Sequence, residues 1–360
     1  MPTKADVRAE AARLQAAFVD AGAVAVEADI LQPADILLDL YGEDIRARAF
    51  VTMDPLQGEQ MLRPDFTVPV VQMHMAEGAE PARYTYSGEV FRRQESTNAK
   101  ASEYIQVGYE VFDRTDAAAS DAEVFALFAK VLAPYDLHPS TGDIGILKAA
   151  IAALDTNEKR KAALMRHIWR PGRFRALLER FGGRTELSWA RRDLLGDPDP
   201  MIHMGTLVGL RSAEEIGERI SALHRDAADP PISAEQVDLL EAILGVKEKL
   251  PAALDLMREF ATTMPAISNA VSRMARRLDA LDQRGVDVSK IDFEASYGRT
   301  SMEYYDGFVF GFYSDAQPGL PPVATGGRYD ALTQVLGQGK SIPAVGGVIR
   351  PELLLQLEGA

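Results

Sequence analysis

The hydrophobic period of this chain changes from that of strands to that of helices and back again, which restricts the folds open to it. Residues 45–113 consist of short runs bounded by turn residues, with the alternation of apolar and polar side chains that strands show. Residues 121–284 carry apolar residues at helical spacing, and strand character returns between 290 and 313. Because runs of strands and of helices are separated, we expect an α+β fold with a mostly antiparallel sheet flanked by helices.

The same patterns predict individual elements and a division into domains. Val7, Ala11, Leu14 and Phe18 form one stripe of an amphipathic helix over residues 4–21. Strands are expected at 45–53, 60–62, 82–87, 89–92, 104–112, 290–297 and 308–313. Helices are expected at 122–132, 157–167, 213–224, 233–244, 267–281, 329–336 and 351–357. We expect one core built from residues 1–150 and 265–360, interrupted by a helical insertion at 151–264.

Composition excludes several classes of function. No apolar run approaches the roughly 20 residues of a membrane-spanning helix, and the amino terminus does not read as a signal peptide, so we expect a cytoplasmic protein without membrane contact. The chain has no cysteine, and its 5 histidines show no paired ligand spacing, so no metal or other cofactor is expected. A net charge of −14 opposes nucleic-acid binding and is compatible with a protein partner.

The first of three informative segments runs from Leu62 to Val70 and places a carboxylate and a hydroxyl two residues apart. In an extended strand, Asp65 and Thr67 would point the same way and could hold an ammonium group together. The other interpretation is an ordinary turn, because Pro-Asp is common turn chemistry.

The second segment contains two expected strands joined by a polar loop, which predicts a hairpin. A period of two places Tyr104, Gln106, Gly108 and Glu110 on one face, toward which Arg92 can converge. A glycine among polar groups suits a small ligand lying close to the backbone. The alternative is the polar outer face of a half-solvated sheet.

The third segment combines Tyr304 and Tyr305 with a glycine-rich turn at Gly326–Gly327, followed by Arg328. Two glycines before a helix expose backbone N–H groups that can receive a carboxylate. A lone Gly-Gly is weak support, and adjacent tyrosines are more often one core and one surface residue than two ligand contacts.

Together, in their order along the chain, the three segments resemble histidyl-tRNA synthetase and its non-synthetase relatives among the class II aminoacyl-tRNA synthetases. The resemblance covers about residues 1–135 and 285–355, and it implies the catalytic-domain fold of that class. Pro33 and the strand after it resemble the first class II motif, which builds the dimer interface in the family. Phe91 to Glu110 resembles the second motif, and Glu303-Tyr304-Tyr305 with Gly326-Gly327-Arg328-Tyr329-Asp330 resembles the histidine-specific signatures.

Departures from the enzymes of this family fall on the positions that bind ATP phosphates. In the second motif and its loop, Gln94 stands in place of a glutamate, and the positions of two arginines are held by Lys100 and Ser102. Amino-acid activation needs positioned cations at the phosphates, so a depleted set predicts that adenylate formation is lost.

The carboxy-terminal motifs depart in the same direction. Thr300 stands where the resemblance places a catalytic arginine, unless the register slips and the neighbouring Arg299 takes that place. In the third motif, Leu353 replaces the final arginine and Arg350 replaces a glycine. The sequence ends ten residues after Arg350, so no anticodon-binding domain is expected.

The amino-acid side of the resemblance is retained, which implies binding without catalysis. The residues expected to bind L-histidine are Asp65, Thr67, Arg92, Gln106, Glu110, Tyr304 and Tyr305, and no catalytic residue is expected. A chain with these losses resembles the regulatory subunits of ATP phosphoribosyltransferase. This resemblance implies a non-enzymatic homodimer that assembles with a short-form catalytic subunit as a hetero-octamer. Histidine would be its effector, in the first step of histidine biosynthesis. The alternatives are a truncated ligase that forms histidyl-adenylate and a stand-alone amino-acid binding protein.

Overall fold

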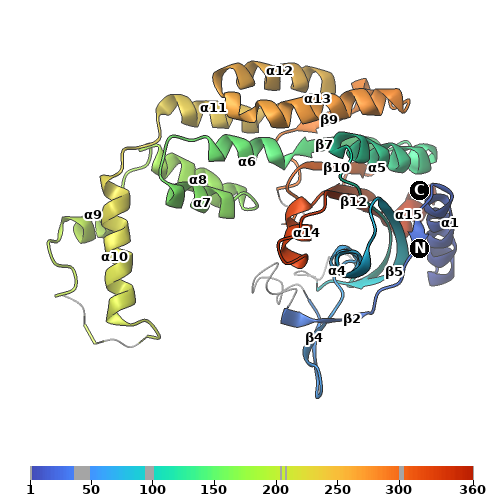
Figure 1. Cartoon of the computed structure of the whole chain (residues 1–360), viewed down its shortest axis with the longest axis horizontal. Helices are drawn as coiled ribbons and strands as arrows, with labels where there is room; N and C mark the ends of the chain where they lie inside the picture. Colours follow the sequence, from blue (N-terminus) through green and yellow to red (C-terminus); the bar gives the residue numbers. More distant parts are fainter. Residues whose placement is uncertain are drawn as a thin grey trace. The chain divides into compact units, whose positions relative to one another are not determined.

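The computed structural model describes residues 2–35, 49–93, 101–202, 205–206, 209–299 and 304–359 (Figure 1). The chain divides into two compact units, a larger one of residues 1–149 and 243–360 and a smaller one of residues 150–242. The expected insertion at 151–264 extends beyond the smaller unit, because helix α12 (Leu250–Thr263) packs on α13 (Ser268–Gln283) in the larger unit. Among the described residues, no helix combines the length and apolarity that crossing a membrane requires.

Within the described part of the chain, the larger unit contains a sheet of nine strands and a second sheet of three strands. In spatial order, the strands of the large sheet are β1 (Val24–Ala25), β5 (Ala82–Phe91), β6 (Glu103–Phe112), β12 (Ala344–Ile349), β11 (Ala324–Arg328), β10 (Phe308–Tyr313), β7 (His138–Asp143), β9 (Asp292–Glu294) and β8 (Lys247–Lys249). The small sheet has the order β2 (Leu31–Pro33), β4 (Gly58–Leu62) and β3 (Val51–Asp54). All neighbours pair antiparallel except β1 with β5 and β7 with β9, so the expected mostly antiparallel sheet is confirmed.

Helices flank the large sheet on both faces (Figure 1). The described helices of the larger unit are α1 (Lys4–Asp20), α4 (Thr67–Glu77), α5 (Ala117–Leu132), α12, α13, α14 (Asp330–Leu336) and α15 (Pro351–Glu358). Those of the smaller unit are α7 (Glu158–Arg166), α8 (Pro171–Phe181), α9 (Trp189–Gly196) and α10 (Ala213–Ala228), and α6 (Ile144–Ala152) and α11 (Ala234–Gly245) run across its two boundaries. Short 3₁₀ helices lie at Ala133–Tyr135, Pro265–Ile267 and Val288–Lys290.

Helix α1 illustrates how local sequence sets an element. Thr3 and Asp6 form a capping box that satisfies free N–H groups of the first turn. The predicted stripe of Val7, Ala11, Leu14 and Phe18 is buried, and Gly22 takes a positive φ of 96° just after the helix. Helix α1 therefore begins and ends where the sequence predicts, to within one residue.

An aromatic layer joins α5 to strand β10. Phe308, Phe310 and Phe312 are two residues apart, so they project from the same face of β10. The ring of Phe125 on α5 lies 5.3–6.2 Å from all three ring centroids. Large rings that exclude water from both elements make this layer a major part of the core.

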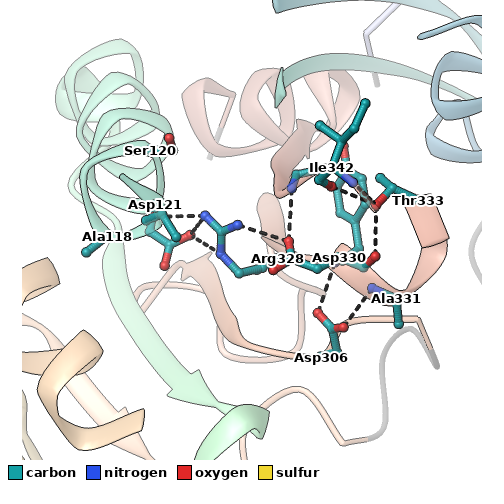
Figure 2. Close-up of polar contacts among 12 residues, drawn as sticks. Ala118, Ser120, Asp121, Asp306, Arg328, Asp330, Ala331, Thr333 and Ile342 are labelled. Atoms are coloured by element: carbon teal, nitrogen blue, oxygen red, sulfur yellow. Dashed lines mark hydrogen bonds and ion pairs between the residues drawn. The ribbon is translucent and has the colours of Figure 1, made fainter. Parts of the chain in front are cut away.

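A buried ion-pair network ties the helices to the sheet around Asp121 on α5 (Figure 2). One oxygen of Asp121 accepts from Arg328 of β11 at 2.7 Å, and the other accepts from Arg277 of α13 at 3.1 Å. Arg277 also donates to Asp143 of β7 at 2.8 Å. Each of these side chains is at most 6% exposed, so the charges depend on one another for compensation.

Several local expectations were wrong. The segment from Asp65 to Val70 is not extended, because α4 begins at Thr67. The Gly326–Gly327 pair is not a turn but lies inside β11. The expected strands at 82–87 and 89–92 form one continuous strand, β5, and strands β7, β11 and β12 had not been anticipated. Most of the segment after Pro33, residues 36–48, lies outside the described residues.

Replacing Asp121 with Asn should lower the free energy of unfolding by about 3–5 kcal/mol, because two buried guanidinium groups lose their shared countercharge. Chemical denaturation measures the change. Asp255→Asn is the matched control, since Asp255 pairs with Arg258 at the surface and its loss should cost about 0.5 kcal/mol or less. Equal effects of the two variants would contradict the role assigned to Asp121.

Candidate functional site

The candidate site lies on one face of the large sheet, where β6 runs between β5 and β12. Glu110 of β6 pairs with Gly346 of β12, and Gly108 of β6 pairs with Tyr86 of β5. From Gln106 to Phe112 every residue of β6 is buried. The polar residues of this strand therefore do not form the solvated outer face that was the alternative interpretation.

Glycines on this face make room for protein side chains. A Cβ at Gly108 would overlap the ring of Tyr86, and a Cβ at Gly346 would overlap the carboxylate of Glu110. The expectation that Gly108 marks close approach of a ligand is therefore wrong, since the Tyr86 ring occupies that space. These glycines allow Tyr86 and Glu110 to lie flat over the neighbouring strands.

Glu110 is the centre of a cluster of hydroxyl groups. Its Oε1 accepts from Tyr86 at 2.8 Å and from Thr67 at 3.3 Å, and its Oε2 accepts from Tyr329 at 2.5 Å. The side chain is 1% exposed, and its burial raises the pKa of the carboxyl to about 7, against the opposing effect of the three hydroxyls. Glu110 is therefore close to half protonated at neutral pH, and it can act as either donor or acceptor.

Asp65 and Thr67 reach the site from the start of α4. Asp65 lies just before the helix, and Thr67 is its first residue, so both side chains are held by the same helix end. Besides its bond to Glu110, Thr67 Oγ1 accepts from the Tyr304 hydroxyl at 3.4 Å. Both residues are almost fully buried, with 3% and 5% of their surface exposed.

Arg92 follows strand β5 and reaches the same helix end. Its Nε donates to the carbonyl oxygen of Pro64 at 2.8 Å, and its Nη2 lies 3.9 Å from Oδ2 of Asp65. The site thus holds a carboxylate and a guanidinium side by side, which suits a ligand that carries both an ammonium and a carboxylate group.

Gln106 lies on β6 two residues before Gly108, so the two residues share a face of the sheet. Its side chain is 1% exposed, and its Oε1 has no hydrogen-bond partner among the described residues. An unsatisfied buried acceptor costs about 1–3 kcal/mol, so a donor from a bound molecule would lower that cost.

Tyr304 and Tyr305 close the site from the loop before β10. The two ring centroids are 4.8 Å apart, and Tyr305 is 6% exposed. Tyr305 lies over Gly327 of β11, where a Cβ would be 2.7 Å from its ring, and burial and Glu110 raise the pKa of its hydroxyl. The structure therefore brings all seven residues expected to bind histidine to one part of the larger unit.

Arg328 does not belong to this site. It donates to Asp121 and Asp330, and its backbone oxygen accepts from the N–H of Asp306 at 2.9 Å (Figure 2). Asp306 in turn accepts from the N–H groups of Asp330 and Ala331, which begin α14. The double glycine before Arg328 is therefore part of the structural network, and the expectation that it receives a carboxylate was wrong.

Two residues that bond to Glu110, Tyr86 and Tyr329, were not among the residues expected to bind histidine. Tyr86 could have been found, because a large ring paired with a glycine on the next strand fills the space that glycine leaves. Tyr329 lies in a segment that resembles a histidine-specific signature, but its contact with Glu110 depends on the pairing of β11 and β12, which are distant from β6 in sequence.

Only some of the positions expected at the nucleotide phosphates lie among the described residues. Ser102 and Leu353 lie in the described part of the chain and carry no charge. Gln94, Lys100, Thr300 and Glu303 lie outside the described residues.

Glu110 should make stability depend on pH in a direction that can be derived. Its pKa is raised from an ordinary 4.5 to about 7, so the folded state keeps a proton that the unfolded state releases between these values. The stabilisation of the folded state that this proton provides is complete below pH 4.5 and is lost as the pH rises through about 7. Relative to Glu110→Gln, which cannot titrate, the wild type should lose up to about 3 kcal/mol of unfolding free energy over this range.

Denaturant unfolding of both proteins at pH 5 and pH 7.5 measures this difference. If the unfolding free energies of the wild type and Glu110→Gln differ by the same amount at both pH values, the pKa of the Glu110 carboxyl is not raised by folding.

Comparison with known proteins identifies the family of this chain. A family model described as histidyl-tRNA synthetase matches residues 1–196 and 216–354. ATP phosphoribosyltransferase regulatory subunits from Brucella canis and Brucella suis are each 33% identical over 369 residues, which cover 93% of this chain and 93% of the relative.

Solved structures show the same fold at lower identity. An ATP phosphoribosyltransferase regulatory subunit/histidyl-tRNA synthetase from Bacillus halodurans has a TM-score of 0.70 and 20% identity, over 98% of this chain and 79% of that one. A histidine–tRNA ligase subunit from Alicyclobacillus acidocaldarius has a TM-score of 0.63 and 22% identity, over 100% and 94% of the two chains. The expected class II aminoacyl-tRNA synthetase-like fold is confirmed. This chain belongs to the histidyl-tRNA synthetase-like family of class II fold, and within it to the ATP phosphoribosyltransferase regulatory subunits.

Proposed function

We propose that this chain is a non-catalytic partner of a short-form ATP phosphoribosyltransferase catalytic subunit, acting in the first step of histidine biosynthesis. The observation that carries the proposal is the 33% identity to curated regulatory subunits over 93% of the chain. A cytoplasmic homodimer that joins the catalytic subunit in a hetero-octamer is part of the proposal. The compact unit of residues 150–242 is, on this view, an insertion into the synthetase-like core.

The proposal includes L-histidine as the effector of the complex. Asp65 and Thr67 would receive its ammonium group, assisted by the unsatisfied oxygen of Gln106. Arg92 would hold the carboxylate. Tyr304 and Tyr305 would enclose the ligand.

Glu110 has a more specific task in this pocket than contact alone. Three hydroxyl donors already occupy its oxygens, which leaves room for about one further hydrogen bond. With a pKa of about 7, it can hold or release a proton toward the imidazole of histidine, whose own pKa is near neutrality. Glu110 would position the neighbouring tyrosines, and these tyrosines would in turn position the imidazole.

Feedback control then follows from differential affinity. Histidine shifts the complex toward an inhibited arrangement only if it binds that arrangement more tightly than the active one. The buried position of the site supports such a difference, because a ligand enclosed by Tyr304 and Tyr305 fixes the loop that carries them.

The rival function, formation of histidyl-adenylate, retains Arg92 in its favour. Against it, Ser102 and Leu353 provide no cation at positions where the family's enzymes use arginine. Histidine-dependent exchange of pyrophosphate into ATP separates the two functions. The regulatory function predicts no exchange above background, and robust exchange would favour the ligase.

Gln106→Met tests the effector site without removing a hydrogen bond between the glutamine oxygen and any described residue. Mixed with a short-form catalytic subunit, the variant should restore ATP phosphoribosyltransferase activity as the wild type does. Its inhibition by histidine should require about tenfold more histidine or higher, because a hydrogen bond to a charged ammonium is lost. Steady-state assays over a histidine series give the inhibition constants.

Thr156→Val is the matched control, since the Thr156 hydroxyl is also buried without a partner among the described residues but belongs to the smaller unit. It should leave inhibition unchanged. Unaltered inhibition in Gln106→Met would remove Gln106 from the effector site, and failure of the wild type to support activity would contradict the proposed function itself.

A further inference from the structure

Arg350 projects onto the same face of the sheet as the candidate site. Gly346 and Val348 pair with Glu110 and Gly108, so they share the face of these residues. Arg350 follows β12 with an extended backbone, φ −108° and ψ 95°, and the alternation therefore continues to it. Its side chain comes to lie on the face where β6 carries Gln106.

The hydrogen bonds of Arg350 confirm this direction independently. Nη2 donates to Oγ1 of Thr325 at 3.3 Å, and Thr325 is the β11 residue that pairs with Val348. Nη1 donates to the carbonyl oxygen of Pro322 at 2.7 Å. These two bonds and a side-chain hydrogen bond with Tyr104 hold the guanidinium, whose five N–H donors leave capacity for a further acceptor.

No acidic side chain in the described part of the chain pairs with Arg350. Among the described residues Arg350 forms no ion pair, although its side chain is partly buried. Burial lowers the pKa of its guanidinium, and the positive charge of Arg92 nearby lowers it further, against the opposing effect of Tyr104 and Tyr305. Since Arg350 has no acidic partner among the described residues and Arg92 lies near enough to affect its pKa, a bound anion would stabilise the two guanidinium groups.

The two ends of the face therefore differ in charge. Tyr305 lies close enough to both Glu110 and Arg350 for each to affect the pKa of its hydroxyl, in opposite directions. A ligand over Tyr305 meets a carboxyl surrounded by hydroxyls on one side and guanidinium groups on the other. An amino acid with a basic side chain has the complementary distribution.

We propose that Arg350 and Arg92 together bind the carboxylate of the amino-acid effector. This inference rests on the proposed function and extends it, because it makes Arg350 a residue that selects an amino acid over the corresponding amine or alcohol. Its chemistry is recognition of an oxyanion by two guanidinium groups, which gives both strength and direction.

Calorimetry with L-histidine and L-histidinol tests the assignment, since histidinol keeps the imidazole and ammonium but has a hydroxymethyl group in place of the carboxylate. The wild type should bind histidine at least about tenfold more tightly than histidinol. Arg350→Gln should weaken histidine binding by about tenfold to a hundredfold and leave histidinol binding nearly unchanged, so that the preference is lost. Arg350→Lys keeps the positive charge but loses the planar guanidinium. Its preference for histidine over histidinol should therefore lie between those of the wild type and Arg350→Gln.

Arg276→Gln is the control for a lost positive charge, because Arg276 is exposed on α13. It should bind both ligands as the wild type does. Thermal unfolding of each variant checks that the fold is retained.

Three outcomes would overturn the inference. If Arg350→Gln keeps the preference for histidine, or loses affinity for both ligands equally, Arg350 does not bind the carboxylate while the histidine site stands. If the wild type binds neither ligand, the proposed effector and this inference both fail. Inorganic phosphate that binds the wild type in place of histidine, and not Arg350→Gln, would assign the anion site to a phosphate.

Discussion

The carboxylate of Asp121 neutralises two buried arginines from different layers of the fold, Arg277 on α13 and Arg328 on β11. Through Arg328 the network continues to Asp330. Asp306 lies between them, since its N–H donates to the backbone oxygen of Arg328 and its carboxylate accepts from the N–H of Asp330. Asp306 directly follows the two tyrosines that close the candidate site. The residue that follows these tyrosines is thus held by the same charged residues that attach the helices to the sheet.

Chemically, the site separates two tasks that an amino-acid-activating enzyme combines. At the amino-acid end, Glu110 is surrounded by hydroxyls, and its raised pKa makes it responsive near neutral pH. At the positions where the family's enzymes bind ATP phosphates, Ser102 and Leu353 provide no cation. On the proposed function this site binds an amino acid, and neither Ser102 nor Leu353 supplies the positioned charge that phosphoryl chemistry requires. This combination suits a regulator better than a ligase.

Elements set by local pattern could be predicted, and elements set by distant packing could not. Helix α1 and strand β10 follow from periodicity alone. The stretch from Asp65 to Thr67 was interpreted as extended or as a turn, but α4 begins at Thr67 and buries Val68, Val70 and Val71. Strands β11 and β12 each contain two glycines, which are unfavourable in isolated strands. Rings and carboxylates from other strands fill those positions, and no local pattern reveals them.

The difference between the two ends of the site can be measured directly by titrating the same preparation with L-histidine and, separately, with a non-hydrolysable ATP analogue. Histidine should saturate one site per chain, and the analogue should give no binding at the same concentrations, with or without histidine. Binding of the ATP analogue that becomes tighter when histidine is present would contradict this, because such coupling is what a pair of substrates in an activating enzyme shows.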